Sequence, residues 1–280
     1  MKQRILSALV GVLVLVLVLL GNQVVFDIVV TLISIAAIYE VIGAVGLKEN
    51  RLMTIIAVIL PVALMLTVNF LSLEYMSSII FLFISFMMII MLFNHHKYSF
   101  SKVTMFIAIS VMISLSFIHV SLVRRLGNEN LDILVVLIGC WITDTCAYFT
   151  GVFCGKHKLA PKISPKKTVE GSIGGIVGVT IILTAYAHVV ANIMGNITVN
   201  TLSAVIIGLL CGVISQFGDL CASIIKRENG VKDFGNIMPG HGGVMDRFDS
   251  FLFVAPAVYY ILKFFPIFQP QSIQDSSQQA

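Results

Sequence analysis

Acidic side chains gather in one stretch of this chain, in a pattern that suits metal-dependent chemistry on phosphate. Seven of the 14 Asp and Glu residues fall between positions 140 and 250. Two of them, Asp246 and Asp249, are three residues apart, so on a helix they project to one side. Paired carboxylates are usual ligands of Mg²⁺, a hard cation that prefers oxygen. We therefore expect a metal-assisted phosphate site here.

A glycine-rich segment lies directly before these carboxylates. Pro239-Gly240 predicts a turn, and Gly242-Gly243 would let backbone N–H groups approach an anion closely. The chain then enters a helix near Asp246, and helix N-termini attract phosphate. His241 could act as a general base or a metal ligand, but its place between glycines favours a hydrogen bond to phosphate or support of the loop.

A polar stripe runs along the helix expected before this loop. Asp219, Ser223 and Lys226 stand at i, i+4 and i+7, so they share one face. They offer an anionic ligand, a hydroxyl and a cation, and Arg227 adds a second cation. This combination suits a metal ion and a phosphate group. The alternative is a solvated helix end with positively charged anchors.

A second basic segment, residues 162–171, precedes a helix rich in glycine. It carries hydroxyl and ammonium groups on Ser164, Lys166, Lys167 and Thr168. Lysines act as point charges for phosphate, so the segment is a candidate substrate-binding loop. Its lysines could instead anchor the chain to anionic lipid headgroups. The glycines that follow predict close helix packing; they are Gly171, Gly174, Gly175 and Gly178.

Asp144 is the clearest carboxylate inside an apolar stretch. A charged side chain within a membrane span is costly and normally faces a cavity, a partner or an ion. We expect Asp144 to take part in the site as a metal ligand or organiser. A hydrogen bond or ion pair between helices is the alternative.

The composition excludes several classes of protein. The chain is 58% hydrophobic and only 11% charged, whereas soluble domains carry about 25% charged residues. It cannot cover a water-facing surface, which excludes a soluble globular enzyme and a disordered tail. The pI near 8.8 and the net charge of +4 are mild, so we expect no nucleic-acid partner.

Runs without Asp, Glu, Lys or Arg predict the membrane spans, since a spanning helix needs about 20 mostly apolar residues. One long run, residues 171–218, holds two spans separated by a turn at 195–200. The fold class is therefore all-α, a polytopic integral membrane bundle of about nine transmembrane helices. The other charge-free spans are residues 5–26, 52–73, 75–96 and 103–123. Three further predicted spans carry a charge: residues 24–45 contain Asp27 and Glu40 near their ends, 132–153 contain Asp144 near the middle, and 249–268 contain Lys263 near the end.

The positive charges predict the orientation of these spans. The N-terminus imitates a secretory signal, but it reaches spanning length and lacks a convincing cleavage site, so we take it as the first helix. Fifteen of the 18 Lys and Arg residues then fall on one side, which predicts a cytosolic N-terminus. Two long basic loops, residues 153–171 and 221–247, face the same cytosolic side.

Three regions are expected along the chain. Residues 1–130 are scaffold helices, and residues 131–268 form a catalytic membrane region that carries the two cytosolic loops. Residues 269–280 form a polar, mobile tail.

The polar residues of the second half resemble a family signature. Ser223 to Arg227, then Lys232-Asp233-Phe234-Gly235, then His241 to Asp249 resemble the signature of CDP-diacylglycerol synthase, also called phosphatidate cytidylyltransferase. There is no departure across these 27 positions. The stretch Ser164 to Gly171 is similar to a second recurring segment of that family. Asp144 with Ala147-Tyr148-Phe149, and Gly218-Asp219-Leu220, also fit it.

The resemblance covers roughly residues 140–250 and implies a function. Family members are Mg²⁺-dependent integral membrane enzymes of phospholipid synthesis. They convert phosphatidic acid and CTP into CDP-diacylglycerol and pyrophosphate. The resemblance also implies a homodimer in the cell (inner) membrane, with its active site at the cytosolic boundary. The phosphate oxygen of phosphatidic acid would attack the α-phosphorus of CTP.

These expectations assign a role to each candidate residue. Asp219 and Asp246 would hold one or two cations, with Asp249 as a third ligand or neighbour and Asp144 as a further ligand or organiser. Lys226 and Arg227 would neutralise the reacting phosphates. The residues expected to contact substrate are Ser164, Lys166, Lys167, Thr168, Ser223, Lys232, His241, Gly242, Gly243 and Arg247.

Two other functions stay open on the sequence. One is a different lipid-phosphate transferase, such as one that uses a polyprenyl phosphate. The other is a transporter or channel with Asp144 and Asp219 on a cation path, although such a protein has little need for the glycine-and-carboxylate loop after residue 232.

Overall fold

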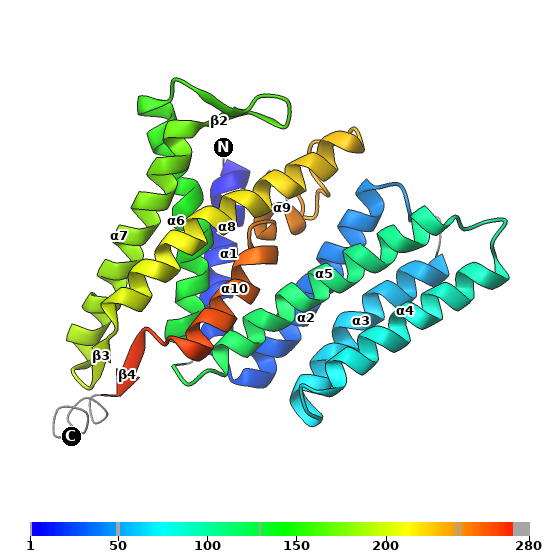
Figure 1. The fold of residues 1–280 in the computed structure, drawn as a ribbon, viewed down its shortest axis with the longest axis horizontal. Coiled ribbons are helices and arrows are strands. Elements are labelled where there is room, and N and C mark those ends of the chain that lie inside the picture. Colours follow the sequence, from blue (N-terminus) through cyan, green and yellow to red (C-terminus); the bar gives the residue numbers. More distant parts are fainter. Residues whose placement is uncertain (1, 49–50, 129, 239, 241, 271–280) are drawn as a thin grey trace. The chain divides into compact units, whose positions relative to one another are not determined.

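A computed structural model of the chain describes residues 2–48, 51–128, 130–238, 240 and 242–270. Helices make up most of it, and the strands are short (Figure 1). The helices are α1 (Lys2–Leu20), α2 (Gln23–Ala44), α3 (Arg51–Phe70), α4 (Tyr75–Phe93), α5 (Phe100–Arg124), α6 (Asn130–Cys154), α7 (Val169–Met194), α8 (Thr201–Glu228), α9 (Met245–Phe248) and α10 (Phe251–Phe264).

Two antiparallel strand pairs accompany the helices. Strand β1 (Lys158–Ala160) pairs with β2 (Ser164–Thr168), and β3 (Ile197–Val199) pairs with β4 (Phe268–Pro270). The first pair turns the predicted loop 153–171 into a hairpin that leads into α7. The second pair places Gln269 opposite Thr198, so the tail expected to be mobile from residue 269 begins in a strand instead. Residues 271–280 of that tail lie outside the described residues.

The predicted all-α membrane bundle is confirmed. Within the described part of the chain, the helices α2 to α8 are seven that are long and apolar enough to cross a bilayer. The two remaining predicted spans correspond to α1, whose segment Leu9–Leu20 is a shorter apolar helix, and to the 14-residue α10. Each of the nine predicted spans therefore overlaps one helix, and α9 is a short extra turn between α8 and α10.

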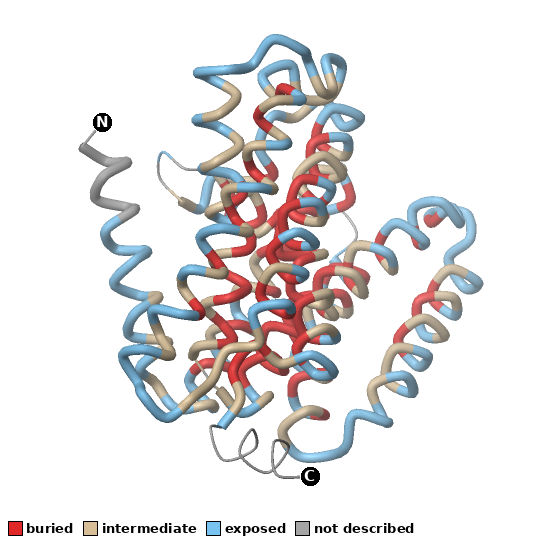
Figure 2. Tube along the Cα trace, turned by 60° about the vertical axis from the view of Figure 1, so that its left-hand side comes forward, coloured by how far each residue is buried: buried red, intermediate tan, exposed pale blue. Residues whose placement is uncertain are grey.

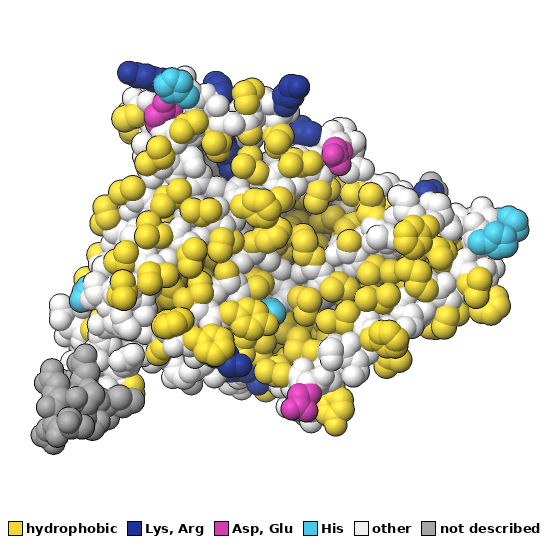
Figure 3. All heavy atoms as spheres, viewed as in Figure 1, with side chains coloured by type: hydrophobic (Ala, Val, Ile, Leu, Met, Phe, Trp, Pro, Cys, Tyr) yellow, Lys and Arg dark blue, Asp and Glu magenta, His cyan; other side chains and the backbone are white. Residues whose placement is uncertain are grey.

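Hydrophobic side chains cover most of the face shown in Figure 3, and charged side chains stand mainly near helix ends and loops. Large apolar residues are widely exposed; Phe93, Phe153 and Ile193 are each about four-fifths exposed. Soluble proteins rarely expose such continuous apolar surface. These faces therefore meet lipid, and the protein is a multi-pass membrane protein. Figure 2 shows buried and exposed positions alternating along the helices, with exposed positions in the turns.

The described chain divides into two compact units, and neither is one continuous stretch. Unit one holds residues 1–121 and 225–252, and unit two holds residues 122–224 and 253–280. In unit one, α2 packs on α3, and the loop after α8 joins this scaffold. Its core includes Ile38, Ile42, Leu60 and Leu64, all at most 2% exposed.

Unit two is built on the close approach of α6 and α7. A Cβ at Gly175 would lie 3.0 Å from the carbonyl oxygen of Thr143, and one at Gly171 would lie 2.7 Å from that of Ala147. Small residues at such crossings let the backbones approach closely. The packing predicted from these glycines is therefore confirmed.

The second predicted loop differs from its expected bounds. Residues 221–228 continue α8, so the loop begins only at Asn229. The polar stripe was expected on a helix that leaves the membrane, and α8 carries it for ten residues past the charge-free run that ends at residue 218, which is about 2.8 turns. Lys226 and Arg227 therefore stand on a helix in its last turn, where positive charge stabilises the C-terminal end.

Candidate active site

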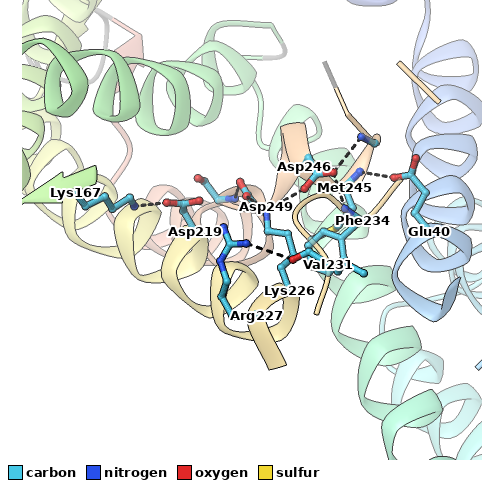
Figure 4. Close-up of polar contacts among 12 residues, drawn as sticks. Glu40, Lys167, Asp219, Lys226, Arg227, Val231, Phe234, Met245, Asp246 and Asp249 are labelled. Atoms are coloured by element: carbon cyan, nitrogen blue, oxygen red, sulfur yellow. Dashed lines mark hydrogen bonds and ion pairs between the residues drawn. The ribbon is translucent and has the colours of Figure 1, made fainter. Parts of the chain in front are cut away.

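Asp246 is held in one orientation by three donors. Its Oδ1 accepts a hydrogen bond from Nζ of Lys226 at 2.9 Å. Its Oδ2 accepts from the backbone N–H groups of Phe234 at 2.8 Å and Gly243 at 3.0 Å (Figure 4). The Asp246 side chain is 3% exposed. Because charge-assisted hydrogen bonds are stronger than neutral ones, this carboxylate is rigidly placed.

Lys226 brings a second carboxylate into the same cluster. Its Nζ lies 3.9 Å from Oδ2 of Asp249 and 5.0 Å from the centre of the Phe234 ring. The Lys226 side chain is 10% exposed and that of Asp249 is 12% exposed. Asp246 and Asp249 thus converge on one cation, as their spacing predicted. We call Lys226, Phe234, Asp246 and Asp249 the α9 cluster, which lies in unit one.

The glycine loop has a tighter internal structure than the sequence indicated. The N–H of Met238 donates to the carbonyl of Gly242 at 2.9 Å, which closes a turn. Gly240 and Gly242 have φ of +78° and +87°, values that only glycine adopts easily. The N–H of Gly243, expected to point at phosphate, donates instead to Asp246. His241 lies outside the described residues.

Glu40 is a buried carboxylate next to the α9 cluster that the sequence reasoning did not single out. It lies on α2, is 3% exposed, and accepts a hydrogen bond from the N–H of Met245 at 2.9 Å through Oε2. Its Oε1 has no hydrogen-bond partner among the described residues. The signal was present, because Glu40 is a carboxylate in an apolar span, as Asp144 is. The sequence reasoning noted its place near one end of the span 24–45 and assigned it no role.

Unit two holds a separate ion pair from the predicted set. Lys167 of β2 pairs with Asp219 of α8, and each side chain is 24% exposed (Figure 4). The basic loop and the polar stripe, predicted from different parts of the sequence, therefore meet. Further up the stripe, the Gln216 amide donates to the backbone oxygens of Ser172 at 3.1 Å and Gly212 at 2.8 Å, which ties α8 to α7.

Thr168 has a structural role that the sequence reasoning did not give it. Its hydroxyl oxygen accepts a hydrogen bond from the N–H of Gly171 at 3.1 Å and caps the N-terminus of α7. This hydroxyl was expected to contact substrate. The neighbouring Lys166 is exposed and Ser164 is half-buried on β2.

The other predicted site residues lie around these clusters or apart from them. Ser223 is buried on α8, and Asp144 is exposed on α6. Arg227 is exposed and donates to the carbonyl of Val231 at 3.4 Å. Lys232 and Arg247 are also exposed.

The chain matches the cytidylyltransferase family model over residues 2–265. It belongs to the cytidylyltransferase family. It is 32% identical to the phosphatidate cytidylyltransferase of Bacillus subtilis (strain 168), over 95% of this chain and 98% of that protein. It is 31% identical to the phosphatidate cytidylyltransferase of Staphylococcus aureus (strain COL), over 94% of this chain and 99% of that protein.

This membership confirms the family resemblance and makes the protein an enzyme. A cytidylyltransferase is a CTP-using nucleotidyltransferase, so the transporter or channel alternative is set aside. The match also extends well beyond residues 140–250, which carried the resemblance. The first half of the chain, which holds Glu40, therefore belongs to the same family fold.

The α9 cluster of this cytidylyltransferase fits a divalent cation by the chemistry of its donors. Asp246 and Asp249 present carboxylate oxygens to a cationic group, and hard cations such as Mg²⁺ prefer oxygen ligands. Lys226 stands where the two carboxylates converge, so positive charge is favoured at that point. Among the described residues, no three His, Cys, Asp or Glu side chains already converge as a complete metal site.

Proposed function

We propose that the protein makes CDP-diacylglycerol from phosphatidic acid and CTP. An oxygen of the lipid phosphate forms a bond to the α-phosphorus of CTP, and the bond from that phosphorus to the β-phosphate oxygen breaks. Pyrophosphate leaves with the electron pair. The observation that supports this most directly is Asp246, fixed by Lys226 and two backbone N–H groups beside Asp249.

The reaction joins two anions, so charge neutralisation and positioning are its main requirements. The phosphate monoester is largely ionised at neutral pH, because its second pKa is about 6. It is already a nucleophile, and no side chain has to remove a proton from it. This agrees with a site composed of carboxylates and lysines.

Lys226 and Lys167 neutralise phosphate charge in this proposal. Each now pairs with a carboxylate, Lys226 with Asp246 and Lys167 with Asp219. Each exchanges that partner for a phosphate oxygen when substrate binds. Arg227, Lys232 and Arg247 are exposed and add positive charge that attracts CTP. Ser164, Lys166 and Ser223 supply further donors.

Asp246, Asp249 and Asp219 would hold Mg²⁺, as one or two ions, with Asp144 as a further ligand or organiser. Bound Mg²⁺ supplies a Lewis acid that draws negative charge from phosphoryl oxygens. The protein's contribution is to orient the carboxylates. The backbone N–H groups of Phe234 and Gly243 donate to Asp246, and the N–H of Ser250 donates to Asp249 at 2.8 Å.

The site is proposed to face the cytosol from the cell (inner) membrane, because CTP is cytosolic and most basic residues fall on one predicted side. The diacyl substrate reaches it from the bilayer, which the exposed apolar helices contact. A homodimer is also proposed, on the family resemblance.

Pyrophosphate release by purified protein in detergent tests the function. Phosphatidic acid, Mg²⁺ and each of the four ribonucleotides are supplied in turn, and release is expected only with CTP and lipid together. A polyprenyl phosphate in place of phosphatidic acid tests the other lipid-phosphate transferase. Release that prefers the polyprenyl phosphate, or another nucleotide, would overturn the proposal. Glu74→Gln, at an exposed position before α4, is the matched control for handling and detergent.

A further inference from the structure

Glu40 lies against the glycine loop with both of its carboxyl oxygens. A Cβ added to Gly235 would lie 2.5 Å from Oε1, and a Cβ added to Gly243 would lie 2.5 Å from Oε2. Real Cβ atoms do not approach so closely. Neither glycine is among those with positive φ, so space rather than backbone conformation excludes a larger residue. A larger residue at either position would therefore displace the Glu40 carboxylate from its place beside the loop.

The same carboxylate fixes the chain directly before Asp246. Two hydrogen bonds hold the segment from Gly243 to Asp246: the N–H of Met245 donates to Oε2 of Glu40, and the N–H of Gly243 donates to the Asp246 side chain. Phe234, next to Gly235, completes the frame through its own N–H to Asp246.

We propose that Glu40 is a positioning residue for the reaction, which places Asp246 through the backbone of Gly243 and Met245. The inference rests on the proposed function. It assigns a role to the scaffold helix α2 and gives a second structural reason for two glycines of the loop. Gly235 and Gly243 make room for a buried carboxylate, whereas the sequence alone indicated room for phosphate at Gly243.

Stability alone is a poor account of this carboxylate. Burying a charged group is unfavourable unless it is fully hydrogen-bonded, and Oε1 has no hydrogen-bond partner in the described structure. An apolar side chain of similar size would avoid that penalty, but it could not accept the Met245 N–H. The carboxylate instead fixes the position of the loop through the N–H of Met245.

Substitution of Glu40 separates positioning from folding. Glu40→Ala is expected to lower kcat/KM about 10–100-fold, the usual cost of losing a group that orients metal ligands. It should also raise the Mg²⁺ concentration that gives half-maximal rate. Glu40→Gln keeps an oxygen for the Met245 N–H and should recover most of the lost rate. A purely structural defect would lower the active fraction without moving the Mg²⁺ dependence.

A double-mutant cycle in thermal unfolding tests the same contact without any substrate. Gly243→Ala should lower the midpoint in the wild-type background, because its methyl group meets Glu40. The same change should cost much less in Glu40→Ala, where that space is open. Such non-additivity is the mark of direct contact. Gly11→Ala, whose added Cβ meets nothing within 4 Å, is the control.

The outcomes keep the two claims apart. Wild-type protein that releases no pyrophosphate from CTP and phosphatidic acid refutes the proposed function. Active wild-type protein with a folded Glu40→Ala variant of unchanged rate and Mg²⁺ dependence refutes the positioning role alone. Equal shifts of the midpoint by Gly243→Ala in both backgrounds refute the contact.

Discussion

Lys226 is nearly enclosed by two carboxylates and an aromatic ring. Its ammonium group contacts Asp246, approaches Asp249 and lies over the Phe234 ring, with 10% of the side chain exposed. Removing one partner of a buried ion pair leaves an uncompensated charge, and that penalty is large. We therefore expect Lys226 to stabilise the folded cluster, in addition to its proposed role in the reaction.

Lys226→Met tests this double role. The methionine is similar in length but uncharged, and it leaves two buried carboxylates facing each other. We expect a loss of about 3–5 kcal/mol in the free energy of unfolding, together with loss of activity. Thermal unfolding in detergent measures the first effect. Adding Asp246→Asn should restore part of the stability, and a single variant as stable as wild type would contradict the account.

Lys167 makes the opposite prediction for stability. Its pair with Asp219 has about a quarter of each side chain exposed, and pairs of this kind contribute only about 0–1 kcal/mol. Lys167→Met should therefore leave the unfolding midpoint almost unchanged while it lowers kcat/KM strongly. The comparison with Lys226→Met under identical conditions is the check. A large stability loss with intact turnover would show that Lys167 has only a structural role.

Helix packing fixes the elements that carry these side chains. In unit two, α7 is packed against α6 through one row of glycines and is contacted by α8 through another. A Cβ at Gly208 would lie 2.7 Å from the Cα of Thr180, and one at Gly212 would lie 2.7 Å from the Cα of Ile176. A backbone atom cannot change rotamer as a side chain can. At both of these α7–α8 contacts, a larger residue would therefore push the helices apart.

Gly212→Ala is expected to destabilise unit two by about 1–3 kcal/mol, the usual cost of overpacking. Helix propensity acts in the opposite direction, since alanine is favoured over glycine by about 1 kcal/mol in a helix. The net fall in unfolding midpoint therefore reports the crossing. Gly11→Ala, in open space, should show no such fall. An unchanged midpoint in Gly212→Ala would mean that the helices separate easily.

The helices were predictable because a helix that crosses a bilayer needs about 20 mostly apolar residues in a row. Apolar runs of spanning length, most of them free of charge, indicated the spans, and closely spaced glycines indicated the α6–α7 contact. The ends of the helices were less predictable. The second cytosolic loop was expected from residue 221, although the polar stripe from Asp219 to Lys226 was placed on a helix, and the structure continues α8 to Glu228.

The site was predictable only in part, for physical reasons that specific residues show. The spacing of Asp246 and Asp249 indicated that both carboxylates project to one side, and in the structure both approach Nζ of Lys226. The Mg²⁺ expected there stays a prediction. Gly243 was interpreted as a phosphate donor because nothing local reveals that Asp246 takes its N–H. Glu40 stands 205 residues before Met245, so no local pattern could pair them.

For the protein as a whole, we propose that the membrane bundle of this cytidylyltransferase holds its active site at Asp246. Family membership over nearly the entire chain and the three donors that fix Asp246 support it. Helices α2 and α9 lie together in unit one, where Glu40 of α2 accepts the N–H of Met245. In the proposal, α2 therefore helps to place Asp246.

The most direct test follows a label from CTP into lipid. Purified protein is incubated with phosphatidic acid, Mg²⁺ and CTP labelled at either the α- or the γ-phosphorus, and the organic phase is counted. The account predicts label in lipid from the α-position only, and its near-complete loss in folded Asp246→Asn. Lipid labelled from the γ-position, or undiminished transfer by Asp246→Asn, would contradict it.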